Sequence, residues 1–95
     1  MREWFKSLPR HDRKSIGEDI KTAQYGWPLG IPLIRKIGRG LWEVRSDIST
    51  GIARVFFTVT DGLMILLHGF VKKSQKTPPN ELDTARRRLN KIEKD

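Results

Sequence analysis

The sequence contains no cysteine and only two histidines, and this excludes several kinds of chemistry. Without cysteine, no disulfide framework, thiolate metal site or thiol nucleophile can form. The two histidines, His11 and His68, are far apart in the chain. We therefore expect neither a metal site nor a cofactor.

Long apolar runs are also missing. The longest, from Leu63 to Leu67, has five residues, whereas a membrane-spanning helix needs about 20. The N-terminus lacks the apolar core of a signal peptide. We therefore expect a cytoplasmic protein that does not bind a membrane.

Acidic residues are few relative to basic ones. Eleven Asp and Glu stand against nineteen Lys and Arg, which gives a formal net charge of +8. With 95 residues the chain can bury one modest core, so residues 1–95 are expected to form a single domain. The basic surface attracts polyanions, which makes nucleic acid the first partner to consider.

Helical patterns occupy the two ends of the chain. Near the N-terminus, Ile16, Ile20 and Ala23 follow the i, i+4, i+7 spacing of a buried stripe, and Gly26 is suited to end that helix. A short helix is expected before it. A last helix is expected to begin at the proline pair 78–79.

Between the helices, runs of branched and aromatic residues with alternating polarity predict three or four strands. The pair Asp61-Gly62 is typical of a two-residue hairpin turn. The order of helices, strands and helix predicts an α+β fold, namely an antiparallel meander with the N-terminal helices and the C-terminal helix packed on it. The expected strands cover residues 33–37, 41–48, 52–59 and 63–71.

Alternation along two of these strands places two arginines on the same face of the sheet. In the 41–48 strand the even-numbered apolar residues suit the core, which leaves Arg45 on the polar face with Glu43 and Asp47. In the 52–59 strand the odd-numbered residues suit the core, which leaves Arg54 on the other face. Both apolar sets share a face only when the connection has two or four residues.

A two-residue hairpin at Asp61-Gly62 extends this register into the last strand. It places Arg54 opposite Gly69, which leaves open space beside the arginine, and it puts Lys73 on the arginine face. His68 then points toward the core. It points toward the basic face if the hairpin is one residue longer.

Two kinds of partner fit each arginine. Arg45 has acids two residues away on either side and can pair with Glu43 or Asp47 in solvent. Arg54 sits in mid-strand between apolar neighbours, with no acid nearby in the sequence. Its donors require either a carboxylate from elsewhere in the fold or a bound phosphate.

The most polarised segment lies between Gly62 and Pro79, where there are three lysines and no acid. Its other polar residues donate hydrogen bonds that suit phosphates. The segment is therefore either a solvated loop or part of a nucleic-acid site. The residues concerned are Lys72, Lys73, Ser74, Gln75, Lys76 and Thr77.

Three blocks of the sequence carry a resemblance to a known family. They are Leu41-Trp42-Glu43-Val44-Arg45-Ser46, then Ala53-Arg54-Val55, and then Leu67-His68-Gly69-Phe70-Val71-Lys72-Lys73-Ser74-Gln75-Lys76-Thr77-Pro78. These blocks resemble the RelE/ParE toxin superfamily, and more closely its branch of HigB-like toxins and phage-derived killer proteins. The resemblance extends over nearly the whole chain from Trp4 onward.

The resemblance implies the toxin of a type II toxin–antitoxin system. Such a toxin has a compact antiparallel sheet and an antitoxin partner, often a helix-turn-helix protein, and HigB-like and RelE-like members cleave ribosome-bound messenger RNA. A homodimer and a toxin–antitoxin hetero-oligomer both remain open. By resemblance, Arg54 matches the strand arginine used at the RNA site. Lys73 and Lys76 fall in the basic segment that supplies further contacts, and Arg45 and His68 occupy family-like positions.

RNA cleavage without a metal requires activation of the ribose 2′-hydroxyl, stabilisation of the extra negative charge and protonation of the departing oxygen. We expect Arg54 and Arg45 to hold the scissile phosphate, and Lys73 or Lys76 to transfer protons. Replacing Arg54 by Ala is expected to abolish cleavage and to leave the fold intact. Further candidate RNA contacts are His68, Lys72, Ser74 and Gln75.

Other functions remain open as well. A ParE-like inhibitor of DNA gyrase, or an inactive relative that only binds its antitoxin, fits the same family. A small nucleic-acid-binding module explains the charge but not the third sequence block. The chain also departs from the family's pattern. Relatives have a strand before the first helix, whereas this sequence is expected to start within that helix. An unpaired sheet edge is then expected. It lacks the tyrosine or second histidine that several active relatives use near the C-terminus.

Overall fold

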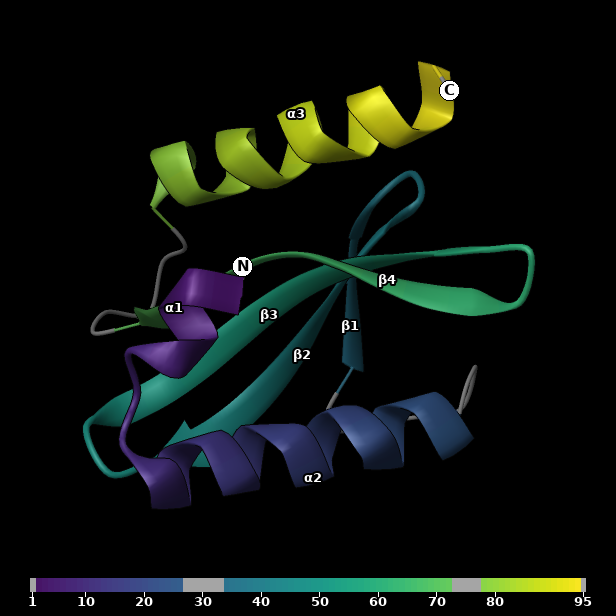
Figure 1. Ribbon diagram of the computed structural model, residues 1–95. Coiled ribbons are helices and arrows are strands. Elements are labelled where there is room, and N and C mark those ends of the chain that lie inside the picture. Colours follow the sequence, from purple (N-terminus) through teal and green to yellow (C-terminus); the bar gives the residue numbers. More distant parts are fainter. Residues whose placement is uncertain (1, 27–33, 73–77, 95) are drawn as a thin grey trace.

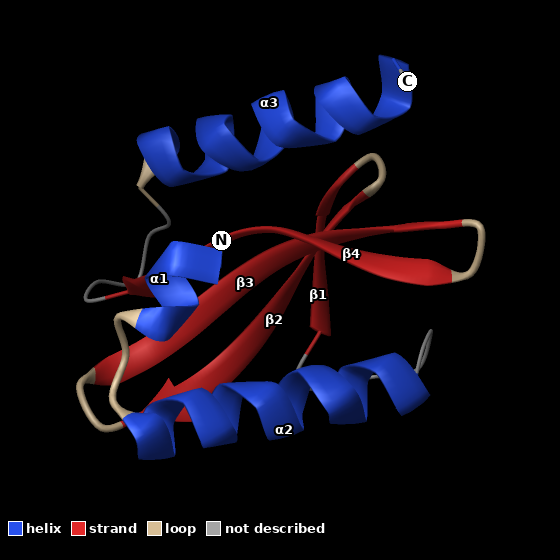
Figure 2. Ribbon diagram, in the orientation of Figure 1, coloured by secondary structure: helices blue, strands red, loops and turns tan. Residues whose placement is uncertain are grey.

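The runs of branched and aromatic residues form a four-stranded antiparallel sheet, and helices lie at both ends of the chain (Figure 2). The computed structural model describes residues 2–26, 34–72 and 78–94. The predicted α+β class and the antiparallel meander are confirmed. The elements are α1 (Arg2–Lys6), α2 (Arg10–Gly26), β1 (Ile34–Gly38), β2 (Leu41–Ile48), β3 (Gly51–Thr60), β4 (Leu63–Lys72) and α3 (Pro79–Lys94).

Each strand pairs with the next one along the chain, in the order β1-β2-β3-β4. Ile48 faces Gly51, so the β2–β3 connection has two residues, as the alternation of apolar residues requires. At the β3–β4 turn, Asp61 and Gly62 have φ values of 51° and 76°. Two successive left-handed residues give the tight turn whose twist matches that of the strands.

Helices cover both faces of the sheet, with α2 on one side and α3 on the other (Figure 1). Apolar side chains point to both faces of the sheet. Those on one face pack against α2, and those on the other face pack against α3. The face that carries Arg45 and Arg54 is therefore polar only in part. One core contains Ile16, Ala23, Ile34, Val44, Ala53, Val55 and Phe57, and the other contains Leu41, Phe56, Leu67, Phe70, Ala85 and Leu89.

A β-bulge interrupts the pairing of β3 with β4. Phe57 pairs with Leu66 and Phe56 pairs with His68, so Leu67 is an extra residue on β4. One extra residue exchanges the faces of every residue that follows it. The sequence contains no turn residue at this point that would predict the bulge.

The bulge changes which side chains accompany Arg54. Arg54 pairs with Phe70, so the predicted pairing with Gly69 is wrong. His68 lies on the arginine face although the hairpin has two residues, because the bulge supplies the additional shift. Lys72, two residues beyond Phe70, lies on this face as well.

Gly69 instead lies on the α2 face of the sheet, under Trp4 of α1. A Cβ atom at this position would collide with the indole ring. The predicted open space beside Arg54 is therefore absent, and the missing side chain makes room for Trp4. Trp4 packs with Phe5 and Leu8 against the core residues beneath α2.

We expect Gly69→Ala to lower the free energy of unfolding by about 1–3 kcal/mol, because the indole or the strand must move. Gly17→Ala in α2 is the matched control, since a Cβ atom there meets nothing within 4 Å. Alanine is the better helix former, so this variant should gain about 0.5–1 kcal/mol. Urea denaturation measures both changes. Equal effects in the two variants would contradict the close packing of Trp4 on Gly69.

Two aspartates fasten α2 to β2 and to the turn that follows it. The buried Asp12 accepts hydrogen bonds from the backbone N–H (3.1 Å) and the hydroxyl (2.8 Å) of Ser49. Asp19 accepts one from the Ser46 hydroxyl at 2.5 Å. Burial alone would raise the pKa of Asp12, but the hydrogen bonds from Ser49 and the neighbouring His11 hold it below its ordinary value of 3.8.

This lowered pKa predicts a pH-dependent stability. A carboxyl whose pKa is lower in the folded chain stabilises the fold fully above its unfolded pKa of 3.8, and that contribution is lost as the pH falls through the folded value. We expect the stability advantage of the wild type over Asp12→Asn to shrink between about pH 6 and about pH 3. Urea denaturation at both pH values measures it. Asp47→Asn, at an exposed aspartate on β2, is the control, and its free energy of unfolding should change with pH as that of the wild type does. A stability advantage of the wild type over Asp12→Asn that is the same at both pH values would refute the assignment.

Candidate functional site

Arg45 on β2 and Arg54 on β3 lie directly opposite one another on the α3 face of the sheet. The predicted shared face is confirmed. Arg45 is exposed, whereas only 7% of the Arg54 surface is accessible. The Cβ atoms of a directly opposed pair are about 5 Å apart. The two arginine side chains therefore leave the sheet side by side.

Glu43 on β2 is the internal partner of Arg54. Its Oε1 accepts a hydrogen bond from Arg54 Nη1 at 2.5 Å, and the two side chains are 1% and 8% exposed. Arg54 thus has a carboxylate as one of its partners. This carboxylate belongs to Glu43, which the sequence predicts as a partner of Arg45. Removing both charges from water is costly, and the close contact between them offsets part of that cost.

Both members of this pair keep an unused polar atom. Within the described part of the chain, Arg54 Nε and Glu43 Oε2 have no hydrogen-bond partner. Buried polar atoms without a partner are uncommon, because each one loses its hydrogen bonds to water. The Nε of Arg54 is therefore a buried donor, closed to solvent, that no described residue satisfies.

Lys72 ends β4 on the same face, one row of the sheet from Arg54, and is 8% exposed. Burial lowers the pKa of Lys72 from its ordinary value of 10.5, and the charge of Arg54 lowers it further. Glu43 opposes this shift, whereas Arg35 and Arg45 add to it. A lysine with a lowered pKa gives up its proton more readily, as a general base must.

His68 lies near the arginines and joins β4 to α3. Its Nε2 is 2.5 Å from Oε2 of Glu81, in the first turn of α3, and its Nδ1 is 3.4 Å from Nη1 of Arg88. The imidazole stacks on Phe70 with 6.2 Å between the ring centroids. In this contact the carboxylate is the acceptor when it is ionised, and the imidazole Nε2–H is then the donor.

The structure brings together part of the predicted site. Arg45, Arg54, His68 and Lys72 share one face, and Lys73, Ser74, Gln75 and Lys76 lie outside the described residues. Sequence reasoning missed two acidic partners, Glu43 for Arg54 and Glu81 for His68. Alternation put Glu43 on the correct face, whereas nothing in the sequence connected the last helix with His68.

Two further findings concern the kinds of site that the described residues form. Residues 2–26, 34–72 and 78–94 contain no group of three or more His, Cys, Asp or Glu side chains placed to hold a metal ion. No helix in these segments is long and apolar enough to cross a membrane.

The sequence matches a family model described as Phage derived protein Gp49-like (DUF891) over residues 3–90. The match includes all four strands and most of α3. The chain belongs to the Gp49-like family. This family is part of the RelE/HigB-like toxins and is associated with toxin–antitoxin systems, which implies an antitoxin partner. No curated protein matches the chain.

The buried pair changes the expected effect of replacing Arg54. Arg54→Ala would leave the Glu43 carboxylate buried without its partner, and the fold would lose stability as well as the arginine. This variant alone therefore does not separate loss of function from loss of folding. A paired replacement of both residues makes that separation.

We expect Glu43→Gln to lower the free energy of unfolding by about 3–5 kcal/mol, because it leaves the Arg54 charge buried and unpaired. The double variant Glu43→Leu with Arg54→Met should recover most of this loss, since apolar residues of similar volume often replace a buried ion pair at little cost. Urea denaturation of the three proteins measures the difference. A double variant less stable than Glu43→Gln would show that the pair itself stabilises the fold.

Proposed function

We propose that this Gp49-like chain is the toxin of a toxin–antitoxin pair, of the HigB-like and phage-derived killer branch, and that it cleaves messenger RNA on the ribosome. The observation that carries the proposal is the group of three cations on one face, Arg45, Arg54 and Lys72, of which the last two are buried. Family membership supports the toxin role. The cations provide what the cleavage of an RNA phosphate needs.

The two arginines bind the scissile phosphate in this mechanism. Arg45 approaches from the exposed side of the pair, and Arg54 lies beside it as a buried positive charge that Glu43 holds in place through Nη1. A fixed donor aimed at developing charge stabilises the transition state without reorganisation during the reaction. Contacts between guanidinium and phosphate oxygens are strong because both groups are charged.

Lys72 in its neutral form accepts the proton of the ribose 2′-hydroxyl. The O2′–P bond then forms and the P–O5′ bond breaks, which leaves a 2′,3′-cyclic phosphate and a 5′-hydroxyl. Lys73 or Lys76 donates the proton to the departing O5′, as the sequence predicts, and no metal or cofactor is needed to balance the step. The lowered pKa of Lys72 supports its role as the base.

The ribosome supplies orientation in this proposal. A lysine base and arginine donors form a modest catalytic set, and much of the barrier in such a reaction is removed by alignment of the 2′-hydroxyl with the phosphorus atom. RNA held on the ribosome has the nucleotides at the cleavage site already positioned. We therefore expect cleavage to depend strongly on programmed ribosomes.

We expect Arg45→Gln to lower the cleavage rate by about tenfold to a hundredfold, because it removes a charged contact to the phosphate. Lys72→Arg keeps the charge but removes the base, and it should lower kcat by about a hundredfold or more. Arg10→Gln is the charge-matched control, since Arg10 is exposed on α2 across the sheet. The measurement is mapping of new transcript ends, with and without programmed ribosomes.

The outcomes of this assay separate the possible functions. Discrete ends with 2′,3′-cyclic phosphates that need both ribosomes and Arg45 would establish the proposed nuclease. Uncut messenger RNA together with DNA breaks in cells would instead indicate gyrase poisoning. A folded protein that binds its antitoxin and does neither would be an inactive relative. Full activity of Lys72→Arg would exclude Lys72 as the base.

A further inference from the structure

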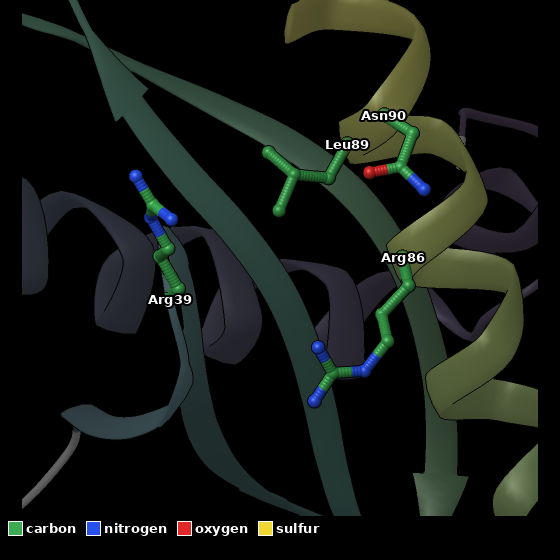
Figure 3. A pocket seen from close by; sticks show the side chains of 4 residues that line it. All are labelled: Arg39, Arg86, Leu89 and Asn90. Carbon is green, nitrogen blue, oxygen red and sulfur yellow. The ribbon is translucent and has the colours of Figure 1, made fainter.

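A second basic feature lies away from the Arg54 site, at the other end of the α3 side of the sheet. The tip of the β1–β2 hairpin and the C-terminal half of α3 line an open pocket of about 470 Å³. Figure 3 shows Arg39 on the hairpin side of this pocket and Arg86, Leu89 and Asn90 on the helix side. The residues that line the pocket thus carry two guanidinium groups, one side-chain amide and one leucine side chain.

The backbone of the hairpin shapes this pocket. A Cβ atom at Gly38 would lie 3.1 Å from Nη2 and 3.5 Å from Nη1 of Arg86, so the guanidinium lies over the strand where a side chain would press on it. Gly40, with φ of 67°, completes the tight turn that places Arg39 at the hairpin tip. The fold therefore positions two arginines of distant sequence around one cavity.

The two arginines differ from Arg54 in what neutralises them. Arg54 has the Glu43 carboxylate, whereas within residues 2–26, 34–72 and 78–94 the side chains of Arg39 and Arg86 form no ion pair or hydrogen bond. Both arginines are exposed and line the same pocket, so their positive charges attract an anion to it. A phosphate has the charge and the oxygen geometry that guanidinium groups bind.

Exposed cations connect this pocket with the Arg54 site. Helix α3 packs mainly on β4 and β3, so β1 and β2 carry the remaining surface of this face. Arg35 on β1 is exposed and lies opposite Glu43 in the strand register. The exposed Arg45 lies two residues beyond Glu43 on the same face of β2. At about 3.3 Å per residue, the path from Arg45 to the hairpin tip is roughly 15–20 Å.

We propose that the pocket between Arg39 and Arg86 binds a backbone phosphate of the RNA strand whose scissile phosphate lies at Arg45 and Arg54. This inference rests on the proposed function and extends it to a second RNA-binding subsite, several nucleotides from the cut. The row of exposed arginines favours RNA over an acidic protein segment, because a regular chain of phosphates follows such a row. The pocket holds the strand and takes no part in the chemistry.

The test uses the full chain and a mixed-sequence single-stranded 2′-O-methyl RNA of about 12 nucleotides, which cannot be cleaved. The variant Arg39→Gln with Arg86→Gln should weaken binding by about tenfold or more, and should reduce the slope of log affinity against log salt by about 0.7, the share of one phosphate on a single strand. Arg39→Lys with Arg86→Lys should keep that slope. Arg10→Gln with Lys14→Gln, on the exposed surface of α2, removes the same charge and should change affinity much less.

Cleavage on programmed ribosomes, measured with the same preparations, separates this inference from the proposed function. Two results would show that the pocket assignment is wrong and would leave the proposed nuclease intact. In the first, the wild type cleaves and the pocket variant binds RNA as tightly as the α2 control. In the second, the wild type cleaves but does not bind the free RNA. If the wild type neither cleaves nor binds, the proposed function is wrong and the pocket assignment with it. Loss of binding to a polyglutamate peptide with RNA binding unchanged would assign the pocket to an acidic protein instead. A raised KM with unchanged kcat in the pocket variant would support a positioning role.

Discussion

The single extra residue in β4 determines which side chains share a face with Arg54. With Leu67 added to the strand, His68, Phe70 and Lys72 turn toward α3, and Gly69 turns toward Trp4. Without it, the same strand would place a glycine beside the arginine and would move the lysine to the opposite side of the sheet. Bulges commonly redirect side chains near functional sites. Both the contact of Trp4 with Gly69 and the presence of Lys72 on the arginine face depend on this one irregularity.

The Glu43–Arg54 pair makes a different kind of demand on the fold. A buried ion pair is seldom more stabilising than the apolar residues that would fit the same space, and this pair leaves one donor and one acceptor without partners among the described residues. A core selected for stability alone has little reason to keep such an arrangement. A site that must hold the charge of an arginine rigidly in place does have a reason, because the carboxylate fixes the guanidinium.

The sequence predicts the elements and the order of the strands well, because strong alternation and clear turn residues act locally. It also predicts that Arg45 and Arg54 share a face, since a two-residue connection permits one register. It fails beyond Leu66, because a bulge depends on how the two strands twist and pack, and Gly69, whose type is compatible with a bulge, does not fix its position. The pairing of His68 with Glu81 arises from the docking of α3 on the sheet, which is a tertiary contact that periodicity does not encode.

The acidic residues explain why the positive charge of this chain faces outward on the α3 side. Asp12 and Asp19 are used to hold α2 to β2, Glu43 neutralises Arg54, and Glu81 binds His68. Each of these carboxylates is committed to an internal contact and is at least partly buried. These four carboxylates are therefore not available to neutralise the exposed arginines along β1, β2 and α3, whereas the exposed Asp47 and Asp83 lie among those arginines. Charge of this kind binds a polyanion at several points along its backbone, so affinity for such a partner should arise from the whole row of cations rather than from the Arg54 site alone.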